Sequence, residues 1–129
     1  GIGKRLDDKK ILIVGMSYRN DVGDFRSSAA VDLAGMCKDA GCIVDCSDPY
    51  IEGDKFEGYS VNNSLENLSC YDSIVLCVSH TEYAERDLEN RLLVYKGFIL
   101  DTNEVLSKDA LRKLVLNGSN VKATGRGDL

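Results

Sequence analysis

Proline is nearly absent from this sequence, and internal repeats and low-complexity linkers are lacking altogether. A chain of 129 residues without such linkers offers no internal domain boundary, so we expect a single globular domain. With 43% hydrophobic and 29% charged residues, the composition excludes disordered, collagen-like and coiled-coil architectures. A domain of this size can bury an independent core, but it is short for a complete two-substrate enzyme.

An excess of positive charge is also lacking. The chain carries 16 Lys and Arg against 21 Asp and Glu, for a net charge of −5. This balance provides no overall positive field for nucleic acid or an anionic membrane, and no apolar run approaches the roughly 20 residues that span a bilayer. We therefore expect neither a nucleic-acid partner nor a membrane partner, and any anionic ligand must meet local cations.

The five cysteines form no Cys-x-x-Cys pair and lie mostly inside apolar runs, where a thiol behaves as a small hydrophobe. Their odd number and the lack of a charged-plus-apolar leader argue against secretion, so we expect reduced thiols, no metal site and a cytoplasmic protein. The chain starts Gly1-Ile2-Gly3 without a methionine. We expect residues 1–9 to be a leader or a cloning remnant and residues 10–129 to be the domain.

Apolar runs alternate with amphipathic segments along the chain. Residues 10–14 form a continuous aliphatic run ended by Gly15, which is typical of a strand buried on both faces of a parallel sheet. The further strands expected are residues 42–46, 59–61, 73–78, 98–101 and 121–124. The helices expected are residues 28–40, 63–70 and 107–117, with a helical or broken-helical stretch at residues 79–95. The pattern predicts an α/β three-layer sandwich, with a mostly parallel sheet of about six strands and helices on both faces.

Two of these helix starts rest on capping boxes, formed by Asn63 with Glu66 and by Ser79 with Glu82. In a doubly wound sheet with a central first strand, ligands bind at the carboxyl ends of the strands where the winding direction reverses. That rule selects the loops at residues 16–26 and 79–83.

The first of these loops combines an aromatic residue, Tyr18, with two arginines, Arg19 and Arg26, ahead of a helix that Ser28 can cap. Such a loop can stack a flat group, bind phosphate oxygens in a fork and offer backbone N–H groups to an anion. It lacks the glycines of the dinucleotide fingerprint after Gly15, so we expect no NAD site of the usual kind here. A receiver domain is also excluded, because it needs acidic residues after the first and third strands.

Several irregular motifs occur together in one order: GMSYRNDVGDFRSSA at residues 15–29, DPY at 48–50, VLCVSHTEY at 75–83, DTNEVL at 101–106 and GRG at 125–127. In this order and spacing they resemble the C-terminal domain of the UDP-glucose/GDP-mannose dehydrogenase family. The resemblance spans nearly the whole chain. It implies a Rossmann-like domain that binds the UDP part of a nucleotide-sugar.

The resemblance also implies what surrounds such a domain. Family members are several times longer, with an N-terminal NAD-binding domain and a central domain that forms dimers and carries the catalytic cysteine. They oxidise the C6 alcohol of a UDP-hexose or UDP-N-acetylhexosamine to a uronic acid for polysaccharide biosynthesis. By this reading the chain is an inactive part of an oxidoreductase, its NAD is bound by an absent domain, and its partners are the UDP-sugar, the missing domains and further copies of itself.

The resemblance assigns candidate UDP-binding roles to Tyr18, Arg19 and Asn103. Arg19 matches a substrate-contacting lysine and would bind the diphosphate, with an exposed loop arginine as the alternative. Tyr18 would pack beside the nucleotide or, equally, cap the core. Asn103 stands where the family has an arginine, and it can hydrogen-bond a base or ribose but cannot neutralise phosphate.

The remaining candidates have structural interpretations. Asp24 and Arg26 are expected to fix the loop through an ion pair. Ser28 is expected to cap the helix rather than to bind a ligand. His80, the only histidine, is expected to be a hydrogen-bonded turn residue, and no catalytic residue is expected in this chain. Two other functions stay open: a free-standing nucleotide-binding or regulatory module, and an interaction domain that self-associates.

Overall fold

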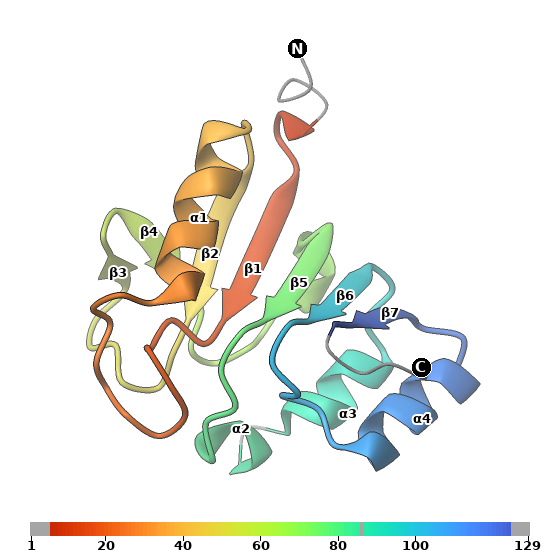
Figure 1. Cartoon of the computed structure of the whole chain (residues 1–129). Helices are drawn as coiled ribbons and strands as arrows, with labels where there is room; N and C mark the ends of the chain where they lie inside the picture. Colours follow the sequence, from red (N-terminus) through yellow and green to blue (C-terminus); the bar gives the residue numbers. More distant parts are fainter. Residues whose placement is uncertain (1–5, 86, 125–129) are drawn as a thin grey trace.

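The computed structural model describes residues 6–85 and 87–124, in which strands and helices alternate (Figure 1). The strands are β1 (Lys10–Val14), β2 (Ile43–Ser47), β3 (Lys55–Phe56), β4 (Tyr59–Val61), β5 (Ser73–Leu76), β6 (Phe98–Asp101) and β7 (Asn120–Ala123). The helices are α1 (Ala29–Asp39), α2 (Glu82–Glu85), α3 (Leu88–Leu93) and α4 (Lys108–Leu116), with a short 3₁₀ helix at Leu68–Cys70.

The strands form one sheet in the order β3-β4-β2-β1-β5-β6-β7. Every neighbouring pair is parallel except β3 and β4. The chain winds outward from β1 in one direction through β2 and β4, and then in the other direction from β5 to β7. The winding direction therefore reverses between β1 and β5, whose carboxyl ends lie side by side.

Side chains of β1 alternate between the two faces of the sheet. Ile13 belongs to a core with Ala30 and Ala34 of α1, whereas Leu12 and Val14 belong to a second core. That second core includes Leu92 of α3 and residues Ala110, Leu111 and Leu114 of α4. All three β1 residues are fully buried, because the strand is covered on both faces as its continuous aliphatic run predicts.

The two cores make a three-layer molecule. Figure 1 shows α1 over the part of the sheet formed by β1, β2 and β4, with α3 and α4 gathered on the other side near β5, β6 and β7. The expected α/β sandwich with a mostly parallel sheet and helices on both faces is confirmed. None of the helices in the described part of the chain is long and apolar enough to cross a membrane.

Two local predictions were wrong, and one short strand was not predicted. Residues 55–56 pair antiparallel with β4 and add a seventh strand to the sheet of about six that the sequence predicts. No helix forms at residues 63–67, since Leu65 and Asn67 have left-handed backbone (φ 58° and 55°) and the Asn63 side chain accepts the backbone N–H of Asp48 instead of capping a helix.

The predicted capping box at Ser79 is also wrong, although a helical stretch does follow. The backbone N–H of Ser79 donates to the Asn20 side chain, and the stretch divides into α2 and α3. The physical reason is the same in both places, because polar side chains brought close by the fold compete with local capping.

Candidate functional site

A hollow of about 440 Å³ lies where the winding direction of the sheet reverses. We call it the switch-point hollow, and its lining residues follow β1, β5 and β6 or begin α1: Ser17, Tyr18, Ala29, Ala30, Leu33, Cys77, Val78, Thr102 and Asn103. Its volume is within the range of small-molecule sites. Of the two loops that the sequence selected, the first contributes Ser17 and Tyr18 to this hollow.

Gly15 starts the loop that forms one wall of the hollow. Its φ of +94° is a conformation that glycine adopts without strain, and a Cβ there would lie 2.6 Å from both the backbone N and the Cβ of Val78. The missing side chain lets the loop after β1 pass directly against the end of β5. Sequence and packing thus agree on why a glycine ends the strand.

Tyr18 and Arg19 stand at the exposed part of this loop. Tyr18 lines the hollow with its side chain 58% exposed, and its backbone N–H donates to the carbonyl of Asp24 across the loop (2.6 Å). Arg19 is exposed and is not among the lining residues. Within residues 6–85 and 87–124, its guanidinium has no ion pair or hydrogen bond, so its positive charge is not paired inside the loop.

The N-terminus of α1 forms the adjacent wall. Ser28 is buried, and its Oγ accepts the backbone N–H groups of Ala30 and Val31 (3.2 and 3.4 Å). The same hydroxyl donates to the carbonyl of Ser17 (3.4 Å), which ties the helix start to the loop after β1. The positive end of an 11-residue helix therefore borders the hollow.

Asp24 and Arg26 form an ion pair at the far side of the loop. The guanidinium of Arg26 donates through Nε and Nη2 to both carboxylate oxygens (3.0 and 2.9 Å), and the Arg26 backbone N–H donates to the carboxylate as well. These hydrogen bonds lower the pKa of Asp24 to about 2. Arg26 is thus paired within the loop, in contrast with Arg19.

Asn103 reaches the hollow from the loop after β6. Its Nδ2 donates to the carbonyl of Cys77 (3.1 Å), which leaves the side-chain oxygen as the acceptor that it can offer a ligand. The buried Asp101 shapes this loop by accepting the backbone N–H groups of Asn103, Val105 and Leu106. The structure therefore brings Tyr18 and Asn103 together in one hollow from opposite ends of the chain.

A buried carboxylate and a buried imidazole support the loop after β1 from below. His80 Nε2 lies 2.9 Å from Asp48 Oδ2, and both side chains are fully buried. The Asp48 carboxylate also accepts the backbone N–H groups of Met16, Ser17 and Tyr50. Sequence reasoning identified His80 as hydrogen-bonded but gave Asp48 no role, although Asp48 begins the DPY motif and directly follows a buried strand.

Asp21, His80 and Glu82 are the one group within residues 6–85 and 87–124 whose ligand atoms lie close enough to hold a metal ion, within 4.8 Å of one another. Their donor atoms are mostly engaged. His80 Nδ1 accepts the backbone N–H of Asp21, and both Asp21 carboxylate oxygens accept hydrogen bonds from Thr81. Only Glu82 Oε2 is buried without a hydrogen-bond partner, so the group fits a hydrogen-bond network better than a cation site.

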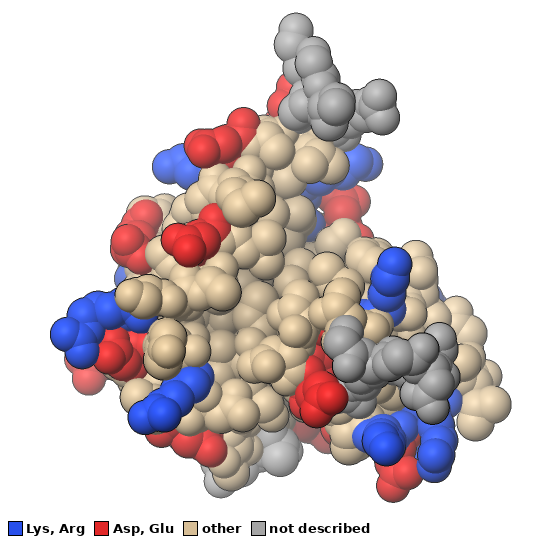
Figure 2. Space-filling model, viewed as in Figure 1, with Lys and Arg blue, Asp and Glu red and all other residues tan. Residues whose placement is uncertain are grey.

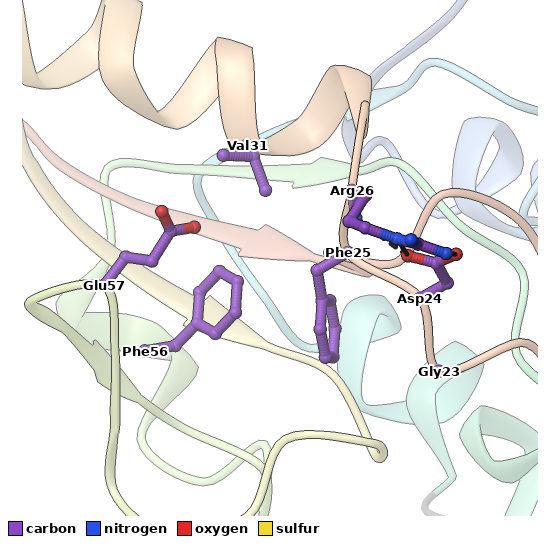
Figure 3. A pocket seen from close by; sticks show the side chains of 7 residues that line it. All are labelled: Gly23, Asp24, Phe25, Arg26, Val31, Phe56 and Glu57. Atoms are coloured by element: carbon purple, nitrogen blue, oxygen red, sulfur yellow. Dashed lines mark hydrogen bonds and ion pairs between the residues drawn. The ribbon is translucent and has the colours of Figure 1, made fainter.

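A second, larger hollow of about 760 Å³ lies beside α1 and β3 (Figure 3). Its apolar lining is Phe25, Phe56 and Val31, and the two phenyl ring centroids are 4.9 Å apart. Figure 3 shows the Asp24–Arg26 pair at one rim and Glu57 at the other. Because its one lining cation is already paired, this hollow is less suited to a phosphate group than the switch-point hollow.

Charge is sparse over the middle of the α1 side of the molecule. Figure 2 shows acidic and basic side chains around the edge of this face and mostly uncharged atoms across its centre.

The thiol of Cys77, which lines the switch-point hollow, has a pKa raised to about 11 by burial. The hollow is bordered by the N-terminus of α1, and Arg19 directly follows its lining residue Tyr18 in the sequence.

Comparison with known proteins agrees with this geometry. The family model described as UDP-glucose/GDP-mannose dehydrogenase family, UDP binding domain, matches residues 12–108. The chain is 30% identical over 125 residues to UDP-N-acetyl-D-mannosamine dehydrogenase of Methanocaldococcus jannaschii, which covers 94% of this chain and 28% of that protein. It is 22% identical over 141 residues to UDP-glucose 6-dehydrogenase of Drosophila melanogaster, with 94% of this chain and 29% of that protein covered.

A solved structure, NDP-N-acetyl-D-galactosaminuronic acid dehydrogenase from Methanosarcina mazei, matches 96% of this chain and 26% of its own, with a TM-score of 0.73 and 24% identity. At that identity the likeness shows the fold. The chain spans under a third of the length of these relatives. Because the family model covers most of the chain, including the loops that form the switch-point hollow, the chain belongs to the UDP-glucose/GDP-mannose dehydrogenase family and corresponds to its UDP binding domain.

Proposed function

We propose that the switch-point hollow binds the UDP part of a UDP-sugar. The observation that carries the proposal is that Tyr18 and Asn103, 85 positions apart, line one hollow at the carboxyl ends of β1, β5 and β6. Ligands of doubly wound sheets bind at this edge. The family model that matches the chain is described as a UDP binding domain.

Each candidate residue has a role that its chemistry supports. The exposed ring of Tyr18 can pack against the uracil or ribose, and the oxygen of Asn103 can accept a hydrogen bond from a ribose hydroxyl or the uracil N–H. The guanidinium of Arg19 and the N-terminus of α1 supply positive potential for the diphosphate. Asp24, Arg26 and Ser28 act on the shape of the loop and on the start of the helix.

The longer protein that we propose is an NAD-dependent dehydrogenase that oxidises the C6 alcohol of a UDP-hexose or UDP-N-acetylhexosamine to a uronic acid. Relatives carry the names of UDP-N-acetylmannosamine, UDP-N-acetylglucosamine and UDP-glucose dehydrogenases. In this proposal NAD and the catalytic cysteine belong to other domains, and several copies of the full protein assemble together. Free thiols at all five cysteines support a reducing compartment such as the cytoplasm.

NAD is a poor ligand for this loop on physical grounds. A dinucleotide fingerprint that begins at Gly15 needs glycines at its third and sixth positions, where this chain has the buried Ser17 and the exposed Asn20. Remote binding energy from UDP would instead hold the sugar against catalytic groups elsewhere.

Calorimetric titration of the purified chain with UDP, GDP and NAD tests the proposal. We expect UDP to bind and NAD not to bind, and preferential binding of NAD would overturn it. Replacing Arg19 with Ala should weaken UDP binding by about 1.5–3 kcal/mol, because charge-assisted hydrogen bonds to the diphosphate are lost. The matched control is Arg112→Ala on α4, which removes an equal charge from an exposed position away from the hollow and should leave UDP affinity unchanged.

A further inference from the structure

The imidazole of His80 bridges two loops in a defined protonation state. Its Nδ1 accepts the backbone N–H of Asp21 (2.9 Å), and its Nε2 lies 2.9 Å from the Asp48 carboxylate. A nitrogen that accepts an N–H carries no proton, so the hydrogen-bond network assigns the neutral tautomer with the proton on Nε2. The ring is also packed between Tyr50 and Tyr83, with centroids 5.0 and 5.6 Å away.

Asp48 fixes the beginning of the loop that carries the proposed UDP-binding residues. Its Oδ2 accepts the backbone N–H groups of Met16 (2.8 Å) and Ser17 (2.9 Å) and the hydroxyl of Ser17 (2.8 Å). The same oxygen takes the hydrogen bond of His80. All four donors and the carboxylate are buried, where hydrogen bonds to a charged group are strong and costly to lose.

A second set of contacts fixes the same loop two residues beyond Arg19. Besides the bond to His80, Asp21 accepts the backbone N–H of Thr81 (2.8 Å) and its hydroxyl (2.9 Å). Asn20 accepts the backbone N–H of Ser79 (2.8 Å). Asp21 has a left-handed backbone (φ 56°), a conformation that aspartate adopts more readily than most other non-glycine residues.

Tyr18 and Arg19 are therefore the two residues between the fixed positions. From this arrangement we infer that His80 is a positioning residue of the UDP site: with Asp48 and Asp21 it holds the loop in the geometry that presents Tyr18 and Arg19 to the nucleotide. The inference rests on the proposed function of the switch-point hollow. It assigns to His80 an effect on ligand affinity, although the side chain is buried beneath the loop.

The energetic consequence follows from the population of the binding-competent loop. When only a fraction of molecules holds the competent geometry, the apparent dissociation constant rises in inverse proportion to that fraction. A loop released at Asp21 would still contain Tyr18 and Arg19, but it would sample many conformations. The loss therefore appears in affinity even when the domain is fully folded.

His80→Gln in the 129-residue chain is the main test. The glutamine amide keeps a donor for Asp48, whose charge would otherwise be buried without His80, but it lacks the rigid ring that offers Nδ1 to Asp21 on the other side. We expect UDP affinity to fall about tenfold, measured by calorimetry at a temperature where the variant is fully folded. Unchanged UDP affinity in the folded variant would overturn the inference.

Tyr95→Phe is the matched control. It also removes a buried hydrogen bond, from Tyr95 Oη to the carbonyl of Tyr71 (2.7 Å), but at the opposite edge of the sheet. We expect it to lower the melting temperature and to leave UDP affinity unchanged. Equal weakening of UDP binding in both variants would show that His80 acts through general stability alone, and would also overturn the inference.

Asp21→Asn serves if His80→Gln does not fold. Asp21 is exposed, and asparagine tolerates the left-handed backbone. The substitution removes the negative charge and replaces one of the two oxygens that accept hydrogen bonds from Thr81 with an amide N–H₂. We expect UDP affinity to fall several-fold without loss of folding. If Asp21→Asn binds UDP as tightly as the wild type does, the inference that these contacts hold the loop for UDP binding is wrong.

Imidazole NMR separates failure of this inference from failure of the proposed function. His80 is the only histidine, so its ring nitrogens give the only imidazole signals of the chain. We expect the Nε2–H tautomer and slow exchange of the Asp21 amide without any ligand. If these are seen and wild-type protein does not bind UDP, the proposed function fails; if UDP binds but the other tautomer is found, the positioning role fails.

Discussion

The two arginines of the loop after β1 differ in whether a carboxylate pairs with them. Arg26 is held by two hydrogen bonds to the Asp24 carboxylate, whereas Arg19 has no such carboxylate within the described residues. The sequence alone shows only that both are basic and close together. Their different availability to a phosphate follows from the loop, whose Tyr18-to-Asp24 backbone hydrogen bond fixes its shape.

The Asp24–Arg26 pair gives a pH prediction. Hydrogen bonds from Arg26 lower the pKa of Asp24 to about 2, below its ordinary value, so the pair is fully formed above about pH 4 and is lost as the pH falls toward 2. A titration of the Asp24 carboxyl carbon by NMR should show this low midpoint. In Arg26→Ala the midpoint should rise toward that of an ordinary aspartate, and an unchanged midpoint in this variant would contradict the assignment of the shift to Arg26.

At the scale of elements, the turn from β1 into its loop depends on Gly15. Alanine there meets both a positive φ, which costs roughly 1–2 kcal/mol for a residue with a Cβ, and a steric overlap with Val78, two residues after the end of β5. We expect Gly15→Ala to reduce the free energy of unfolding by at least about 2 kcal/mol. Denaturant unfolding measures the change.

Gly35 provides the control for this substitution. It lies within α1, and a Cβ there would meet nothing within 4 Å. Gly35→Ala should therefore stabilise the domain by about 0.5–1 kcal/mol through the higher helix propensity of alanine. Similar losses in both variants would show that the cost at Gly15 does not come from its backbone conformation and its overlap with Val78.

Elements whose signals are local could be predicted from the sequence. The aliphatic runs at residues 10–14 and 73–78 were predicted to be strands; β1 and β5 form there, with β5 ending at Leu76, and Ser28 and Ser107 cap α1 and α4. The edge strand β3 has two residues and no run of its own, so its pairing with β4 was not visible. A strand this short depends on the hairpin around Glu57 and Gly58, both of which have positive φ.

The site divides in the same way. Tyr18, Arg19 and Asn103 could be selected because the resemblance is carried by motifs in loops. The support given by Asp48 and His80 could not, since the two residues are 32 positions apart and meet only when β2 and β5 flank β1. Such long-range pairs leave no periodicity in the sequence, and the wrong helix start at Asn63 has the same origin.

At the scale of the whole molecule, the sheet order explains why one small domain can form a binding hollow. Winding outward in both directions from β1 and β5 leaves their carboxyl ends uncovered between two diverging connections. The loops that follow β1, β5 and β6 meet there and surround the switch-point hollow. The fold thus places the proposed UDP-binding residues at one edge of the sheet, whereas the described residues offer few groups for catalysis.

This limitation gives a prediction for the chain on its own. To oxidise an alcohol with NAD, the protein must bind NAD as the hydride acceptor. The second oxidation step also needs a nucleophile. The pKa values of Cys77 and Cys46 are raised by burial to about 11 and about 12, so little thiolate forms at neutral pH. The loop after β1 has Ser17 and Asn20 where a dinucleotide fingerprint that begins at Gly15 would have glycines.

We therefore expect the 129-residue chain to bind UDP while producing no NADH from UDP-glucose, UDP-N-acetylglucosamine or UDP-N-acetylmannosamine. Absorbance at the NADH wavelength measures turnover, and calorimetry on the same sample confirms binding. The control for contaminating enzyme is Cys77→Ser, because any NADH formation that this domain itself catalyses through a thiol in the hollow would be lost in the variant. Turnover that is present in the purified chain and absent in Cys77→Ser would show that the hollow carries out the chemistry as well as the binding.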